Sequence, residues 1–358
     1  MGRTLHTLAI VATVGLMAWA GAAQAQEPSA DPAERAIALT NCRSSTAPKP
    51  RELACAAAEQ NPLLKPDDLA LAHFFRAMAL WDQSRFDDAK AELLTATSLD
   101  LDLWPAYWFL GQRYFNDLKF EEAASSWSVV IAHNPTLAGA YERRGMALDH
   151  AGREAEAATD FTRAIELAGP ARIKAPLFAD RGEALIGTFE LDKARADFDQ
   201  ASHFDEHEIR AYFGRGRIAY LTGDFDTATE QFMKLSALSP DFPYAPLWLF
   251  LAQSRAGKEA KAALRKWADG KDLKPWPGAL VRLYLGELTV EQFDALPMPA
   301  SAYPPDELCE KAFYLAELAR IHGHRTQATA LLRAAVATDV KYFIEYQAAA
   351  YELDHPSR

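Results

Sequence analysis

Small residues recur at a fixed spacing along this chain, and that spacing limits the fold more than any other feature. One alanine marks each period, at intervals of 34, 34, 37 and 34 residues: Ala89, Ala123, Ala157, Ala194 and Ala228. Another small residue lies twelve positions earlier: Ala77, Gly111, Gly145, Gly182 and Gly216. A large apolar residue follows each alanine by four positions: Leu93, Trp127, Phe161, Phe198 and Phe232. A chance amphipathic series would not keep this phase, so the chain is built from repeats.

Two antiparallel helices packed against each other explain the pattern. Where their backbones come closest only Gly or Ala fits, because a larger side chain would push the helices apart. The large apolar side chains then fill the space between one hairpin and the next. A 34-residue period with these residue types resembles the tetratricopeptide repeat (TPR). This resemblance implies an all-α solenoid of helical hairpins, wound as a right-handed superhelix and closed by a C-terminal capping helix.

The phase of the pattern divides the chain into segments. We expect a signal peptide over residues 1–25, an N-terminal segment over 26–69, five TPR repeats over 70–244, a degenerate repeat with linker helices over 245–301, and a final TPR with its capping helix over 302–358. Two short helices are expected at 280–285 and 290–296. The 37-residue interval includes residues 169–176, where one glycine and two prolines predict a longer loop between repeats.

The N-terminus has the features of a secretory signal peptide. A positive charge lies within the first three residues, an apolar stretch runs from about residue 8 to residue 19, and small residues at 23 and 25 favour cleavage between Ala25 and Gln26. An uncleaved membrane anchor is the alternative, but the apolar run is shorter than the ~20 residues that a bilayer requires. No cysteine near the cleavage site could accept a lipid. We therefore expect a periplasmic protein without a stable membrane anchor.

The three cysteines divide into a close pair and a single residue. In an exported protein, Cys42 and Cys55 are expected to form a disulfide that fastens the mature N-terminus. Two unpaired, small hydrophobic side chains are the alternative. Cys309 begins an apolar helical pattern, and we expect it to be buried and inert.

Composition and motifs argue against several classes of function. The chain has 38 Lys and Arg against 49 Asp and Glu, and no basic stripe, so nucleic acid is not an expected partner. Nucleophile-elbow, phosphate-loop and dinucleotide motifs are absent from the sequence, so we expect neither an enzyme nor a cofactor. Histidine clusters occur at 203–208 and 322–324. Zinc needs three or four ligands that converge in tetrahedral geometry, and a solvent-exposed turn does not guarantee this arrangement. We expect no metal.

The C-terminal part of the chain resembles the end of the periplasmic lipoprotein NlpI and related bacterial TPR proteins. The matching stretches are Trp276 and residues 281–289 (VRLYLGELT), 313–315 (FYL), 334–337 (AAVA) and 343–346 (FIEY). In that family the repeats form a scaffold that docks a C-terminal-processing protease and peptidoglycan hydrolases, which the resemblance implies here. The chain departs from the family because it lacks the lipid-accepting cysteine, so membrane tethering is not carried over.

The TPR resemblance also implies which side chains line the concave groove. The candidates for a protein-binding groove are Phe74, Met78, Trp81, Trp108, Gln112, Phe115, Asn116, Met146, Arg210, Phe213, Arg217 and Tyr220. Apolar groups along a concave surface indicate a docking surface for a peptide or helix. Coverage by the N-terminal segment, or ordinary core packing, is the alternative. The carboxylate clamp of chaperone-binding TPR proteins requires Lys and Asn at the positions where this chain has Phe74 and Met78. We therefore do not expect this chain to bind chaperone tails.

These observations favour a periplasmic scaffold or adaptor that binds envelope proteins such as a C-terminal-processing protease or a peptidoglycan hydrolase. An assembly factor for an outer-membrane or envelope complex is the alternative, because fold alone does not determine function. A hydrolytic enzyme, with a site built from the acidic and histidine residues of the turns, is the third alternative.

Overall fold

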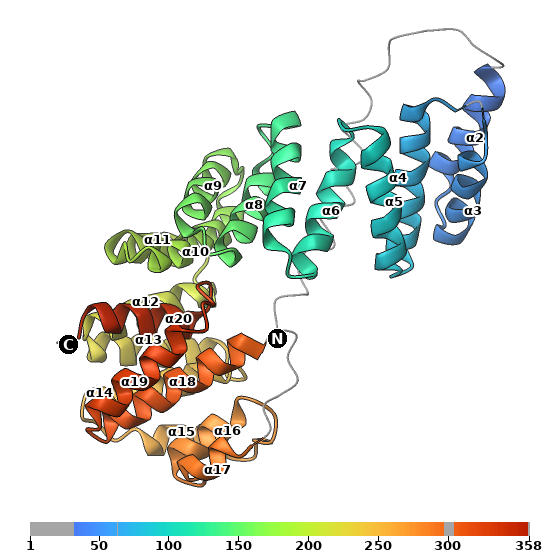
Figure 1. Ribbon diagram of the computed structural model, residues 1–358. Helices are drawn as coiled ribbons and strands as arrows, with labels where there is room; N and C mark the ends of the chain where they lie inside the picture. The colour runs from blue at the N-terminus through green and yellow to red at the C-terminus, as the bar shows by residue number, and fades with distance from the viewer. Residues whose placement is uncertain (1–31, 63, 297–303, 357–358) are drawn as a thin grey trace. The chain divides into compact units, whose positions relative to one another are not determined.

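The computed structural model describes residues 32–62, 64–296 and 304–356, and every regular element within those ranges is an α-helix (Figure 1). The prediction of an all-α helical-hairpin solenoid is confirmed. None of the helices in the described ranges is both long and apolar enough to cross a membrane. The signal peptide and its cleavage site, expected at residues 1–25, lie outside the described residues.

The chain divides into two compact units, which we describe separately. Unit 1 is Met1–Pro135 and unit 2 is Thr136–Arg358. The described helices of unit 1 are α2 (Pro32–Ser44), α3 (Pro48–Glu59), α4 (Pro66–Asp82), α5 (Phe86–Leu99), α6 (Trp104–Asn116) and α7 (Phe120–His133). Those of unit 2 are α8 (Ala138–His150), α9 (Glu154–Leu167), α10 (Ala171–Gly187), α11 (Leu191–Phe204), α12 (Ile209–Thr222), α13 (Phe225–Leu238), α14 (Tyr244–Arg255), α15 (Lys261–Ala268), α16 (Gly278–Leu285), α17 (Val290–Asp294), α18 (Pro304–Ile321), α19 (Arg325–Val336) and α20 (Ile344–Asp354).

The glycines of the small-residue series lie under aromatic rings. A Cβ atom added at Gly145 of α8 would come within 2.9 Å of the Phe161 ring of α9. The same relationship joins Gly111 to Trp127, Gly182 to Phe198 and Gly216 to Phe232. Each aromatic residue therefore covers the glycine of its own hairpin, whereas the repeat pattern predicts that it fills the space between successive hairpins. Phe198 does both, since its ring also meets Gly214 of α12.

In the N-terminal segment, residues 32–59 form a helical hairpin closed by a disulfide. Cys42 of α2 and Cys55 of α3 are bonded, which confirms the predicted pair. Both cysteines are fully buried, in a cluster that includes Ala72 of α4. Closing a loop of this size stabilises a chain by about 3 kcal/mol in the loop-entropy account. Cys309 is buried and unbonded, as expected, and burial raises the pKa of its thiol.

The loop predicted at residues 169–176 is wrong. Helix α10 begins at Ala171 and includes Pro176 in its second turn. Ala175 and Leu177, on either side of this proline, are buried. Burial of these side chains offsets the backbone hydrogen bond that proline cannot make, so tertiary packing overrides the local preference.

Candidate functional site

Half-buried aromatic side chains of α4 and α6 contact one another in unit 1. The ring centroids of Phe74 and Phe109 lie 6.2 Å apart, and those of Trp81 and Phe109 lie 5.5 Å apart. Trp81 also contacts Phe86 at the start of α5, with centroids 5.3 Å apart. Phe109 thus joins the two aromatic residues of α4 into one cluster. We call Phe74, Trp81 and Phe109 the aromatic face.

Phe109 is absent from the residues predicted to line the groove, and Trp108 stands in its place. In the structure, the ring of Phe109 contacts the aromatic residues of α4. Trp108 lies on the same helix and is half-buried. The run of three aromatic residues at 107–109 was the sequence feature that could have pointed to Phe109. Consecutive helical residues point about 100° apart, so an error of one position selects a different ring.

The other predicted groove residues of unit 1 have local partners. Phe115 contacts Phe120 and Trp127 of α7, with centroids 5.4 and 6.1 Å apart, so it packs within its own hairpin. Gln112 donates a 3.1 Å hydrogen bond from Nε2 to Oδ1 of Asn116, one turn further along α6. Met78 is half-buried against the core of α4 to α6.

Three of the four groove residues predicted on α12 are buried, so their assignment to an open surface is wrong. Phe213, Arg217 and Tyr220 are 7%, 0% and 2% exposed. The rings of Phe213 and Tyr220 pack against Trp248 of α14, with centroids 6.0 and 5.4 Å away. The hydroxyl group of Tyr220 hydrogen-bonds to Glu317 of α18. These side chains belong to the interior of unit 2.

Helix α20 covers this part of unit 2. Figure 1 shows α20 beside α12, and Arg217 of α12 donates a 2.8 Å hydrogen bond from Nη2 to Oε1 of Gln347. Tyr351 of α20 contacts Phe189, which follows α10, with ring centroids 5.4 Å apart. Before α20, Tyr342 contacts His150 of α8 at 4.9 Å. The C-terminal segment of the chain therefore contacts α8, α12 and the residue Phe189 after α10, and Arg217 is the predicted groove residue among these contacts.

Two remaining groove candidates lie elsewhere in unit 2. Met146 is half-buried on α8. Arg210, at the start of α12, pairs with Asp180 of α10 and with Glu208, whose Oε1 atom is 2.9 Å from Nε. Its charge is thus compensated within the chain.

Buried carboxylates accompany the C-terminal helices. Trp276 donates a 2.9 Å hydrogen bond from Nε1 to Oε2 of Glu310 on α18. The Tyr314 hydroxyl lies 3.3 Å from Oε1 of Glu345, the second residue of α20. Burial, together with the charge of Glu345, raises the pKa of Glu310 to about 8. Burial likewise raises the pKa of Glu345 to about 7.

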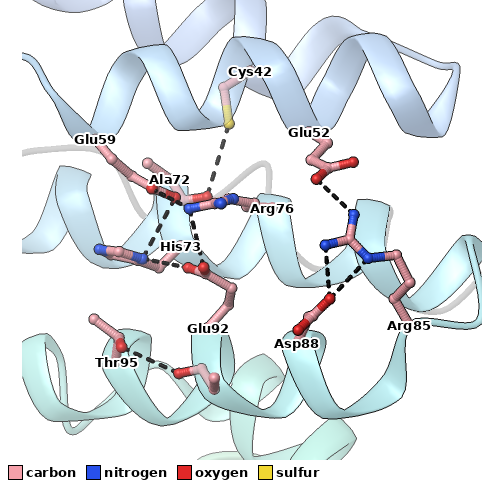
Figure 2. Close-up of polar contacts among 11 residues, drawn as sticks. Cys42, Glu52, Glu59, Ala72, His73, Arg76, Arg85, Asp88, Glu92 and Thr95 are labelled. Atoms are coloured by element: carbon pink, nitrogen blue, oxygen red, sulfur yellow. Dashed lines mark hydrogen bonds and ion pairs between the residues drawn. The ribbon is translucent and has the colours of Figure 1, made fainter.

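A polar cluster lies between α3, α4 and α5 of unit 1 (Figure 2). The Nδ1 atom of His73 is 2.6 Å from Oε2 of Glu92 and 3.5 Å from Oε1 of Glu59. Arg76 places Nη1 2.6 Å from Oε2 of Glu59 and 3.0 Å from Oε1 of Glu92. Within the described part of the chain, Glu59, His73 and Glu92 are the side chains grouped closely enough to hold a metal ion. Sequence reasoning missed them because they come from three helices and share no motif spacing.

The repeat architecture defines a helical-repeat solenoid. Residues 209–242 match the family model of the tetratricopeptide repeat, so this segment of the chain is a TPR. A tetratricopeptide repeat protein from Parabacteroides merdae has a similar structure, with a TM-score of 0.53 and 14% identity over 78% of this chain and 98% of that chain. This likeness supports the fold alone. PilW, described as a type IV pilus biogenesis factor, has a TM-score of 0.49 and 16% identity over 56% of this chain and 93% of that one. YrrB, described as a TPR protein with an unusual peptide-binding site, has a TM-score of 0.47 and 20% identity over 54% of this chain and 95% of that chain.

Proposed function

We propose that this protein is a periplasmic interaction scaffold that docks a protein partner on the aromatic face of unit 1. The observation that carries the proposal is the half-buried cluster of Phe74, Trp81 and Phe109, formed across α4 and α6. Aromatic side chains bury a large area with few rotatable bonds, and they are enriched among the residues that dominate binding energy. Arrays of TPR type present extended binding surfaces.

The burial of α12 favours unit 1 over unit 2 as the docking surface. Phe213, Arg217 and Tyr220 are covered by helices of the same chain, whereas the aromatic face remains half-exposed in its unit. The Cys42–Cys55 disulfide supports export, because disulfides persist in oxidising compartments such as the periplasm.

The partner class follows from the resemblance of the C-terminal part to NlpI-type proteins. We propose a C-terminal-processing protease or a peptidoglycan hydrolase as the partner. The scaffold then brings an envelope enzyme to its substrate or to a second protein, and contributes no catalytic group of its own.

The test is a binding titration with purified enzymes of these two classes from the same organism. Trp81→Ala combined with Phe109→Ala should weaken binding at least tenfold, which corresponds to about 1.4 kcal/mol. The loss follows from removing two of the three aromatic rings that form the face. Circular dichroism and thermal unfolding check that the variant remains folded.

Lys119→Ala combined with Glu122→Ala is the matched control. Both residues are exposed at the start of α7 in the same unit, and single exposed charges contribute little to binding. If the aromatic variant binds normally while Arg282→Ala combined with Glu287→Ala abolishes binding, the partner docks on the NlpI-like end and the proposed surface is wrong. If neither enzyme binds the wild-type chain while an outer-membrane assembly protein does, the assembly-factor alternative replaces the proposed partner class.

A further inference from the structure

Three side chains that could bind a metal converge from three helices of unit 1 (Figure 2). Glu59 is the last residue of α3, His73 lies in the middle of α4, and Glu92 lies in the first half of α5. One ligand atom from each falls within 4.8 Å of the other two. All three side chains are mostly buried, with exposed fractions of 7% for Glu59 and 16% for each of the other two.

The two carboxylates divide their oxygens between Arg76 and His73. Arg76 contacts Oε2 of Glu59 and Oε1 of Glu92. The remaining oxygens, Oε1 of Glu59 and Oε2 of Glu92, face Nδ1 of His73. Metal-binding carboxylates in proteins are commonly held in this way by a hydrogen-bond donor on the oxygen that does not bind the metal. Arg76 therefore acts as the group that orients both carboxylates.

One of the converging oxygens has an unfilled bonding capacity. Within the described residues, Oε1 of Glu59 is buried and accepts no hydrogen bond, although it lies 3.5 Å from Nδ1 of His73. A buried carboxylate oxygen is normally hydrogen-bonded or bound to a cation.

The charge of the cluster still attracts a divalent cation. Two ionised carboxylates and the Arg76 guanidinium leave one negative charge when His73 is neutral, which is the form that binds a metal. An internal ion-pair network without a metal is the competing account. It explains the contacts of Arg76, but it leaves Oε1 of Glu59 without a hydrogen bond.

We propose that Nδ1 of His73, Oε1 of Glu59 and Oε2 of Glu92 bind one Zn²⁺ ion per chain, with water at the fourth position. One imidazole and two carboxylates form a ligand set that suits zinc, and three protein ligands with one open position are common at zinc sites. Ligands about 2.1 Å from a tetrahedral zinc ion lie about 3.4 Å apart. The 3.5 Å separation between His73 and Glu59 already fits. The 2.6 Å pair of His73 and Glu92 opens when the ion binds, and the proton of the neutral His73 ring is then carried by Nε2.

Such an ion joins the N-terminal hairpin to the first repeat. Its ligands come from α3 on one side and from α4 and α5 on the other, while the disulfide closes the hairpin of α2 and α3. Because zinc binds the folded site and not the unfolded chain, it should raise the thermal stability of unit 1.

The experiment is a calorimetric titration of the full-length mature chain with zinc chloride, after removal of bound metal with a chelator. We expect one Zn²⁺ per chain with a Kd of about 1 μM or tighter, and a higher melting temperature in the presence of zinc. Co²⁺ in place of Zn²⁺ should give the visible absorption of a tetrahedral site with nitrogen and oxygen ligands. His73→Gln and Glu92→Gln should each lower zinc affinity about 10–100-fold.

His133→Gln is the control, because His133 is a histidine of α7 in the same unit and, among the described residues, its ion pair is with the single carboxylate of Asp102, at 3.3 Å. It should leave zinc binding unchanged. The proposal is overturned if the wild-type chain takes up no zinc at micromolar concentrations. It is equally overturned if His73→Gln and Glu92→Gln both bind zinc like the wild type, since the ion would then sit on other side chains.

Discussion

The guanidinium group of Arg217 binds Oε1 of Gln347, 130 residues later in the chain, at 2.8 Å. Arg217 lies on α12 and is fully buried, and its Nη1 atom is 2.6 Å from Oε2 of Glu183 on α10. One side chain thus ties the C-terminal helix to two helices of the repeat array. A buried charge is costly unless it is paired and hydrogen-bonded, so Arg217 and α20 depend on each other.

Replacing Arg217 should therefore loosen α20. Arg217→Met removes the bond to Gln347 and leaves Glu183 without its cation, and breaking a buried pair from one side costs about 3–5 kcal/mol. Hydrogen exchange of the amides of Ile344–Asp354 should become faster, and the melting temperature should fall. Arg333→Met, at an exposed position of α19, is the matched control and should change neither. Unchanged exchange of α20 in Arg217→Met would show that other contacts hold the helix in place.

The glycines under aromatic rings should tolerate no side chain. Gly145→Leu places bulk where a Cβ atom alone would approach Phe161 to 2.9 Å, and overpacking of this kind costs about 1–3 kcal/mol. Chemical denaturation should show this loss. Gly169→Ala provides the control, because an added Cβ atom there meets nothing within 4 Å. Equal stability of the two variants would contradict the packing described for the repeats.

The disulfide should stabilise unit 1 against unfolding. Cys42→Ser combined with Cys55→Ser opens the loop and should cost about 3 kcal/mol in the loop-entropy account. Mass spectrometry without reductant should detect the linked peptide in the exported protein, while native Cys309 resists alkylation because it is buried. If Cys42 and Cys55 can both be alkylated without reductant, the exported form lacks this disulfide.

Stability should fall as the pH rises, because Glu310 holds a proton in the folded state. Its pKa is raised from an ordinary 4.5 to about 8, so the folded chain retains a proton that the unfolded chain has released. The stabilisation from this group is complete below pH 4.5 and is lost as the pH rises towards 8. Glu310→Gln cannot ionise, and its amide can still accept the Trp276 hydrogen bond.

Between pH 5 and pH 9, the wild type should accordingly lose about 2 kcal/mol or more relative to Glu310→Gln, since each unit of pKa shift corresponds to about 1.4 kcal/mol. Denaturant titrations at both pH values measure the difference. Glu287→Gln, at an exposed position after α16, is the control and should show the same pH dependence of stability as the wild type. Parallel pH profiles for wild type and Glu310→Gln would mean that Glu310 is ionised throughout.

Local patterns in the sequence account for the parts of the fold that could be predicted. The spacing of Gly145 and Phe161 repeats along the chain because each hairpin must solve the same packing problem between its two helices. Cys42 and Cys55 lie in adjacent helices of one hairpin, so their pairing needed no knowledge of distant segments. The prediction of a loop around Pro176 was wrong because it relied on local preference alone. Burial of Ala175 and Leu177 outweighs the preference of proline for a loop.

The amino-acid sequence by itself determined the repeat period, the helical class and the disulfide, because these depend on interactions between residues close in the chain. Only the tertiary structure decided which candidate side chains remain exposed. Trp81 and Tyr220 occupy equivalent positions of the repeat, yet Trp81 is half-buried and Tyr220 is enclosed by α14 and α18. Glu59, His73 and Glu92 likewise meet only through the packing of three helices. The periodic pattern specifies the faces of a helix, but which distant segment covers a face depends on the path of the whole chain.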